Sequence, residues 1–355
     1  MPPLTQQIRF GTSTDGTRIA YATAGAGAPL VKVSNWLSHL EFDWQSPVWS
    51  HLLRELSSGH TLVRYDERGC GLSDWDAELT FDAWVQDLET IVDACRLERF
   101  PLLGLSQGAS IAIAYAVRHP ERVSHLIIHG GYARGRQFWE PAPTSQDEAE
   151  MMIRLAELGW GQHNPAFRQF FTTQFIPDGT PEQHQWFNEL ERISTSPRNA
   201  GRFMRVFNAI DVVALLPKVA CPTLVSHGVH DARVPFEEGR LIATHIPDAR
   251  FVPLETQNHL LLETEPAWAR WIEAFRAFLP PSTQSPLFDT LTRRERELIE
   301  LIAQGRDNAQ IAAHFDLSAK TVRNHITSIF AKLEVENRAQ AIVLAREAGF
   351  GDARD

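Results

Sequence analysis

The sequence predicts two folds in one chain: an α/β fold with a doubly wound, mostly parallel sheet over about the first 280 residues, and a small all-α domain of four helices after it. Short apolar runs that fit buried strands alternate with helix-length segments, which is typical of a parallel sheet covered on both faces. A Pro- and Ser-rich stretch, PPSTQSP, then interrupts the alternation. Beyond it the apolar residues recur only at helical spacing.

The first fold rests on eight predicted strands and the helices between them. The first two strands flank Asp15-Gly16 and are expected to form a hairpin. The strands are Ile8–Thr12, Arg18–Ala24, Leu30–Val33, Thr61–Tyr65, Phe100–Leu105, Val123–His129, Pro222–His227 and Arg250–Leu254. The helices are Phe81–Cys95, Gln107–Arg118, Phe236–His245 and Pro266–Phe278.

Residues 132–218 interrupt this alternation, because they are helical in pattern and rich in large aromatic side chains. We expect them to form a helical lid over the carboxyl end of the sheet, with most of the aromatics serving as the core of the lid itself. The composition of the stretch after residue 280 predicts a linker at 281–287. The predicted domains are therefore 1–280 and 288–355.

Composition excludes several classes of protein. A net charge of −10 argues against a generally basic nucleic-acid coat, although the chain from Leu287 onward, with 10 Lys and Arg against 11 Asp and Glu, carries only −1 of it. The apolar runs are too short to span a bilayer. The three cysteines have no metal-like spacing, and the N-terminus lacks the layout of a signal peptide. We expect a cytoplasmic protein without a metal or cofactor.

A candidate nucleophile lies in GLSQGAS, where Ser106 follows a predicted strand and precedes a predicted helix. Gly104 and Gly108 allow the tight strand-to-helix turn that exposes a serine at the end of a sheet. A serine hydroxyl becomes a useful nucleophile when a base takes its proton and an acid orients that base. The surrounding pattern makes this motif more specific than Gly-x-Ser-x-Gly alone.

Over residues 8–280 the chain resembles the α/β-hydrolase family, in which the order is serine, acid, histidine. HGVHDARVP then supplies Asp231 as the acid and QNHLLLETEP supplies His259 as the base. Asp231 could instead be a turn aspartate before Val234-Pro235. The turn DERGCGLS also matches the family and is interpreted as structural, while His129, His227 and His230 are assigned to packing or to the surface.

The resemblance also implies an oxyanion hole, formed by the backbone N–H groups of Gln107 and Trp36. The family usually has His-Gly before the second of these positions, whereas this chain has Ser34-Asn35. The sequence leaves open whether this loop presents the Trp36 N–H to a ligand. It also leaves open whether Ser106 turns a substrate over or only holds it.

The C-terminal part has the caps and spacing of four short helices. Thr292 and Glu295 fit a capping box, Gly305 ends the first helix, and Ser318 begins the third. The buried face of the third helix is predicted to carry Val322, Ile326, Ile329, Phe330 and Leu333. The alternative is an amphipathic helical hairpin with a solvated basic face.

From Leu291 to Gly349 this part resembles the LuxR/FixJ-type helix-turn-helix domain, through LTRRERE, LIAQG, LSAKTVRNHI and NRAQA. The resemblance implies base contacts by Arg323, Asn324 and Thr327. It implies phosphate contacts by Asn308, Ser318, Lys320, Thr321 and Lys332. Such domains usually bind a pseudo-palindromic DNA site as homodimers. The last helix, Arg338–Ala348, is either a dimer seam or simply the fourth core helix.

The sequence thus predicts a regulator that binds DNA and senses a small apolar ester, lactone or carboxylic acid, with hydrolysis as an open possibility. The first alternative is a serine esterase whose helix-turn-helix tail is secondary. The second is an inactive hydrolase scaffold that binds a partner protein. Loss of ester turnover on changing Ser106 would favour the esterase, and failure of serine-directed inhibitors to label it would favour the scaffold.

Overall fold

The computed structural model describes residues 5–139, 142–279, 288, 290–315, 317–348 and 350–351. The chain divides into two compact units, one ending at Leu279 and the other made mainly of the residues from 280 onward. Each unit has its own apolar core. The predicted linker at 281–287 lies outside the described residues.

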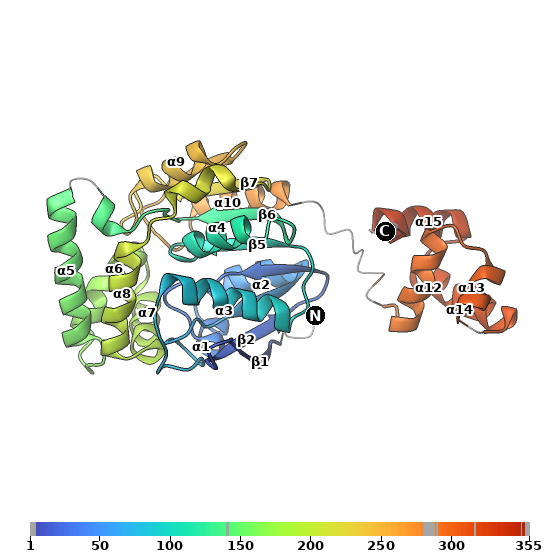
Figure 1. The fold of residues 1–355 in the computed structure, drawn as a ribbon, viewed down its shortest axis with the longest axis horizontal. Helices are drawn as coiled ribbons and strands as arrows, with labels where there is room; N and C mark the ends of the chain where they lie inside the picture. The colour runs from blue at the N-terminus through green and yellow to red at the C-terminus, as the bar shows by residue number, and fades with distance from the viewer. Residues whose placement is uncertain are drawn as a thin grey trace. The chain divides into compact units, whose positions relative to one another are not determined.

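An eight-stranded sheet forms the centre of the first unit (Figure 1). Its order is β1-β2-β4-β3-β5-β6-β7-β8. β1 and β2 are antiparallel, as are β2 and β4, whereas β3 pairs with β5, β5 with β6, β6 with β7 and β7 with β8 in parallel. This confirms the predicted α/β fold. The strands are β1 (Gln7–Thr12), β2 (Arg18–Ala24), β3 (Ala28–Lys32), β4 (His60–Tyr65), β5 (Phe100–Leu105), β6 (Val123–His129), β7 (Thr223–Gly228) and β8 (Arg250–Leu254).

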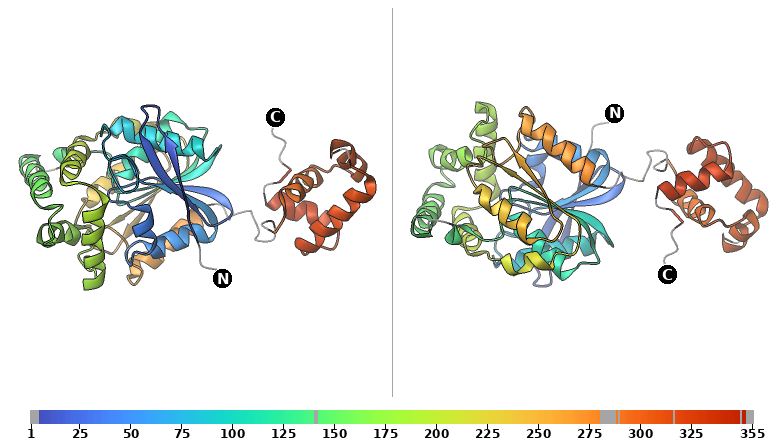
Figure 2. Two further views of the ribbon diagram at one scale, coloured as in Figure 1. Left: turned by 90° about the horizontal axis from the view of Figure 1, so that it is seen from below. Right: turned by 90° about the horizontal axis from the view of Figure 1, so that it is seen from above.

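Helices cover both faces of this sheet (Figure 2). On one face, α2 (Ser50–Ser58) meets α10 (Pro266–Phe278) through the rings of His51 and Trp268, whose centroids are 4.5 Å apart. On the other face α3 (Phe81–Ala94) packs against α4 (Gly108–Arg118), and α9 (Phe236–His245) lies beside β7. The helix α2 and the short α1 (Leu40–Trp44) were not among the predicted helices. α1 has five residues and α2 has nine, and segments of this length are too short for hydrophobic periodicity to distinguish a helix from a loop.

Between β6 and β7 the chain forms the lid (Figure 1). Two 3-10 turns, η1 (Arg136–Phe138) and η2 (Val213–Lys218), flank its four helices, α5 (Ala142–Gly159), α6 (Ala166–Phe175), α7 (Pro181–Ser194) and α8 (Pro197–Ala209). Most of the large aromatics of this segment are buried, as expected, while Phe170 stays 41% exposed. The lid also packs on the body, because Trp36 stacks on Trp160 with ring centroids 5.1 Å apart.

Among its described residues the second unit contains the helices α12 (Arg293–Ala303), α13 (Asn308–Phe315), α14 (Ala319–Lys332) and α15 (Arg338–Glu347). The predicted capping box is present, since the Thr292 side chain accepts from the Glu295 N–H and the Glu295 side chain accepts from the Thr292 N–H. Gly305, at φ +82°, follows the end of α12 in the left-handed conformation that suits glycine. Of the five predicted core positions on α14 and just beyond it, four are buried and Phe330 is half-buried. No helix among the described residues is long and apolar enough to cross a bilayer.

Candidate active site and DNA-binding face

Ser106 lies on a strained turn between β5 and α4. Its φ is +50°, a left-handed conformation that side-chain-bearing residues rarely adopt, and its N–H donates to the carbonyl of His129 at 3.0 Å. The two glycines are needed for packing. A Cβ at Gly104 would lie 2.7 Å from the Ala109 Cα, and one at Gly108 would lie 2.7 Å from the Ser34 carbonyl oxygen. The turn is therefore built around the serine, which supports a function for it.

Asp231 and His259 meet at the carboxyl ends of β7 and β8. The His259 Nδ1 donates to the Asp231 Oδ2 at 2.7 Å, and both side chains are 1% exposed. Asp231 also has the turn role considered above, because its Oδ1 accepts the N–H groups of Arg233 and Val234. Burial by itself raises the pKa of Asp231, but His259 and the hydrogen bonds lower it overall. The acid therefore stays ionised and fixes the proton of His259 on Nδ1.

The Nε2 of His259 is buried, and it has no hydrogen-bond partner among the described residues. Ser106 and His259 lie on either side of Gly130-Gly131: a Cβ at Gly130 would lie 3.0 Å from the His259 Cε1, and one at Gly131 would lie 3.6 Å from the Ser106 carbonyl oxygen. The serine and the base share one corner of the sheet without a hydrogen bond between them. Such bonds are often long before a ligand arrives.

The lid holds His259 in place. The carbonyl of Phe175, the last residue of α6, accepts the N–H of His259 at 2.9 Å and that of Leu260 at 3.1 Å. The Phe175 ring lies edge-on to the imidazole, with centroids 5.6 Å apart. A movement of α6 would therefore move the base.

The implied oxyanion hole is occupied by a protein side chain. The Trp36 N–H donates to the Gln107 Oε1 at 3.1 Å, and the Gln107 Nε2 donates to the Glu67 Oε2 at 3.1 Å. All three residues are buried. Trp36 and Gln107 lie together, as the family resemblance implied, but a ligand oxygen can reach the Trp36 N–H only by displacing the Gln107 amide.

Glu67 belongs to the turn DERGCGLS, which was predicted to be structural, and it is connected to the site through this bond. Burial raises the pKa of Glu67 to about 8, and its Oε1 has no hydrogen-bond partner among the described residues. Glu67 is consequently protonated at neutral pH. Its neighbour Asp66 has the expected structural role, since its Oδ2 accepts the N–H groups of Leu40 and Leu72.

A pocket opens beside Ser106 under the lid. Its cavity has a volume of about 30 Å³, room for about two water molecules. Five of the eleven lining side chains are aromatic, and two others are guanidinium groups to which the sequence patterns assigned no role. The lining residues are Trp36, Ser106, Gln107, Tyr132, Arg136, Trp139, Phe175, Phe207, Asn208, Arg233 and Val234.

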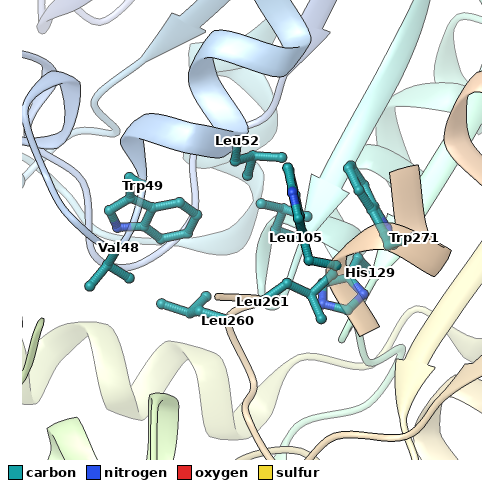
Figure 3. Close-up of a pocket in the computed structure, with 9 residues that line it drawn as sticks. Val48, Trp49, Leu52, Leu105, His129, Leu260, Leu261 and Trp271 are labelled. Carbon is teal, nitrogen blue, oxygen red and sulfur yellow. The ribbon is translucent and has the colours of Figure 1, made fainter. Parts of the chain in front are cut away.

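A second cavity, about 20 Å³ in volume, is lined almost entirely by apolar side chains from α2, α10 and the segment after His259 (Figure 3). Its polar wall is His129, whose Nδ1 lies 3.1 Å from the Ser226 Oγ. Burial lowers the pKa of His129 to about 3 and also lowers that of His227, so both rings are neutral. Their assignment as packing residues fits this, although the His227 Nε2 lies 3.5 Å from the Asp231 Oδ2.

The candidate DNA-binding face lies on α14. Lys320, Arg323 and Asn324 are exposed, and their side chains have no hydrogen bond or ion pair within the described part of the chain. Thr327 is exposed too and donates to the Arg323 carbonyl at 3.0 Å. Ser318 caps α14 by accepting the Thr321 N–H, and the hydroxyl groups of these two residues are 2.8 Å apart.

Two of the proposed phosphate contacts already have partners inside the domain. The Lys332 Nζ donates to the Glu295 Oε2 at 2.6 Å, and the Asn308 Oδ1 accepts from the Arg338 Nη1 at 2.9 Å. These side chains hold α14 to α12 and α13 to α15. Their DNA contacts stay predictions, as do those of the exposed residues. No cluster of metal-ligating side chains occurs among the residues described.

Comparison with known proteins agrees with this geometry. The family model of the α/β hydrolase fold matches residues 40–266, and that of the luxR family of bacterial regulatory proteins matches residues 289–345. The chain is 28% identical over 253 residues to an AB hydrolase superfamily protein, YisY, from Bacillus subtilis, covering 66% of this chain and 86% of that protein. It is 45% identical over 60 residues to the transcriptional regulatory protein DesR of the same organism, covering 17% of this chain and 30% of that regulator. Among solved structures, an esterase from Exiguobacterium antarcticum superposes with a TM-score of 0.64 at 24% identity, over 76% of this chain and 98% of the esterase, which establishes the fold alone.

Proposed function

Because the chain belongs to the α/β hydrolase fold family and carries a LuxR-family DNA-binding domain at its C-terminal end, we propose that it is a cytoplasmic, ligand-responsive transcriptional regulator. Residues 1–280 bind a small apolar ester, lactone or carboxylic acid, and residues 288–355 bind DNA. The observation that carries the proposal is the pairing of a DNA-binding domain with a buried pocket that opens onto Ser106.

In this proposal Ser106 is the nucleophile, His259 the base and Asp231 the acid that orients it. The lone pair of the His259 Nε2 takes the Ser106 proton, and Oγ attacks the carbonyl carbon of the bound ester. The Trp36 N–H and the Gln107 N–H stabilise the charge on the carbonyl oxygen once the Gln107 side chain has withdrawn. The hydrogen bond from the Trp36 N–H to the Gln107 side chain supports this requirement, because the Trp36 N–H is already paired.

The signal reaches DNA as a population shift: a ligand that binds one arrangement of the chain more tightly favours that arrangement by its difference in affinity. We propose that two chains bind one pseudo-palindromic operator, with Arg323, Asn324 and Thr327 reading bases. Asn308, Ser318, Lys320, Thr321 and Lys332 hold the phosphates. Half-sites then repeat at about one helical turn, roughly 10 bp.

The test begins by selecting the operator from random DNA with the full-length chain. Anisotropy titrations with that operator then measure DNA affinity with and without phenyl acetate, γ-butyrolactone, phenylacetic acid and a broader set of esters and acids. We expect at least one compound that binds the pocket to change DNA affinity. If a compound binds the pocket and DNA affinity never changes, the regulator hypothesis is wrong.

A serine esterase with a secondary tail is the competing proposal, and the hydrogen bond between Asp231 and His259 favours retained chemistry. Hydrolysis of p-nitrophenyl acetate by the wild type and by Ser106→Ala separates the two proposals. Turnover lost in Ser106→Ala, without any ligand effect on DNA binding, favours the esterase. A Ser106→Ala variant that still responds to ligand in the DNA assay shows that sensing needs no hydrolysis.

A further inference from the structure

Two arginines line the Ser106 pocket from different parts of the chain. Arg136 comes from η1, just after β6, and Arg233 comes from the loop after β7, two residues beyond Asp231. Neither the serine motif nor the family resemblance assigns a role to them. In a wall that otherwise combines five aromatic side chains with neutral residues, two cationic groups indicate what kind of ligand this pocket binds.

The two guanidinium groups differ in their partners. The Arg136 Nη1 forms an ion pair with the Glu148 Oε2 at 2.7 Å, and Glu148 is 49% exposed. The Arg233 Nη1 donates to the Gln174 Oε1 at 2.9 Å, which is a neutral amide. No carboxylate lies within ion-pair distance of Arg233 in the described chain.

The carboxyl groups closest to Arg233 do not pair with it directly. Both oxygens of Asp231 accept hydrogen bonds, from His259 and from the backbone N–H groups of Arg233 and Val234. Burial raises the pKa of Glu191 well above its ordinary value, and no ion pair joins this carboxyl group to Arg233 in the described chain. Arg233 is therefore a cation of the pocket wall that has no directly paired anion.

A buried cation without a directly paired anion costs stability, and the Phe175 ring, whose centroid lies 5.3 Å from the Arg233 guanidinium carbon, offsets only part of this cost. Burial, together with the like charge of Arg136, lowers the pKa of Arg233 to about 10. Arg233 nevertheless stays charged at neutral pH. A ligand anion would remove this penalty, and a planar guanidinium group suits a carboxylate because it can donate two parallel hydrogen bonds.

We infer that the Ser106 pocket binds ligands that carry a carboxylate, and that Arg233, together with Arg136, binds this group. The ligand class is a small half-ester or a lactone acid, with its ester carbonyl toward Ser106 and its apolar part against Tyr132, Trp139 and Phe175. This inference rests on the proposed function of the pocket as the ligand site. It adds the charge of the ligand to that proposal.

The test uses the full-length Ser106→Ala variant, so that nothing is hydrolysed, and two probes that differ in charge. Monomethyl glutarate is an anion at pH 7, and dimethyl glutarate is its neutral counterpart. Calorimetry or tryptophan fluorescence gives both dissociation constants. We expect the anion to bind about tenfold or more tightly than the diester.

Arg233→Gln, added to this background, is expected to bring the two affinities within about threefold, mainly by weakening the anion. Arg136→Gln is the second variant, in case Arg233→Gln does not fold. Arg205→Gln is the matched control, because Arg205 is a lid arginine that pairs with Glu157 at the surface and does not line the pocket. It should leave the tenfold preference intact.

Equal binding of the two probes, tighter binding of the diester, or binding of neither probe overturns the inference. So does a preference for the anion that survives both Arg233→Gln and Arg136→Gln. In each of these cases a neutral ester that changes operator affinity would still support the proposed function. Failure of the regulator hypothesis, by contrast, appears as anion binding without any effect on DNA.

Discussion

The hydrogen bond between the Trp36 N–H and the Gln107 side chain gives a sharp prediction about how the site is held closed. In Gln107→Met a side chain of similar length replaces Gln107, but it has no carbonyl oxygen. The Trp36 N–H is then buried without a partner, since Trp36 is only 4% exposed. Such a donor costs about 1–3 kcal/mol. We expect the free energy of unfolding to fall by at least this amount.

A ligand oxygen placed at the Trp36 N–H would recover the same free energy. Phenylboronic acid is a suitable probe, because it forms a tetrahedral adduct with a serine Oγ and places an oxygen in the oxyanion hole. About 1–3 kcal/mol corresponds to an affinity about 5- to 150-fold higher for Gln107→Met than for the wild type. Tryptophan fluorescence can follow this binding, as Trp36 and Trp139 line the pocket.

Two controls separate this effect from a general loosening of the site. Gln107→Glu keeps a side-chain oxygen and should not bind the boronic acid more tightly, and Ser106→Ala should bind it poorly in every background. If a folded Gln107→Met protein binds phenylboronic acid no better than the wild type, the Trp36 N–H does not face the ligand. The proposed oxyanion hole would then be wrong.

Three further predictions concern DNA binding, pH and the acid of the site. Arg323→Ala should weaken operator binding by about 1–3 kcal/mol and relax the preference at one base pair, whereas Lys320→Ala should weaken binding equally on all sequences. Binding to a panel of single-base operator variants checks this. A uniform loss of affinity in Arg323→Ala would make Arg323 a phosphate contact. Since the pKa of Glu67 is raised from 4.5 to about 8, the folded protein keeps a proton that the unfolded chain releases, and the free energy of unfolding should decline as pH rises between these values. Glu67→Gln should remove this contribution, which amounts to at most about 1.4 kcal/mol per pH unit. Urea titrations at pH 5, 6.5 and 8 measure the free energy of unfolding of both proteins. If it falls equally with pH in the variant and in the wild type, Glu67 does not cause the decline. Asp231→Asn should lower any Ser106-dependent ester turnover by orders of magnitude with little loss of ligand affinity, and unchanged turnover would leave Asp231 only its role in the turn.

Local sequence patterns predicted the elements of the fold well where the pattern was long or repeated. The eight strands lie within one or two residues of their predicted bounds, because buried parallel strands are continuous apolar runs between turn residues. The capping box at Thr292 and the cap at Ser318 were predictable because both are made within four residues of chain. The order of the strands in the sheet was not derivable from these patterns.

The site was predictable in its chain order and not in its side-chain contacts. Asp231 and His259 follow strand ends in the order that the family resemblance implies, and they form a hydrogen bond. The Gln107 amide meets the Trp36 N–H across 71 positions of sequence, and it meets Glu67 across 40. Pairings of this length depend on how the loops pack.

The two pocket arginines differ in how far their place in the sequence indicates a role in the site. Arg233 lies inside HGVHDARVP, two residues after the proposed acid, and a cation this close to a predicted reactive site indicates a ligand-binding residue. Arg136 had no comparable signal. Only the folded chain brings η1 and the loop after β7 to the same pocket.

The packing of Trp36 has a consequence for engineering a biosensor from this chain. Its indole stacks on Trp160 of the lid while its N–H reaches Gln107, so widening the pocket at Trp36 would disturb both. Tyr132 is different, because it holds Ser110 through its backbone carbonyl, which a new side chain leaves in place, whereas the Phe175 ring itself contacts His259. If the chain is the proposed sensor, a library built at Tyr132 would change the pocket wall while keeping the contacts of Trp36 and His259.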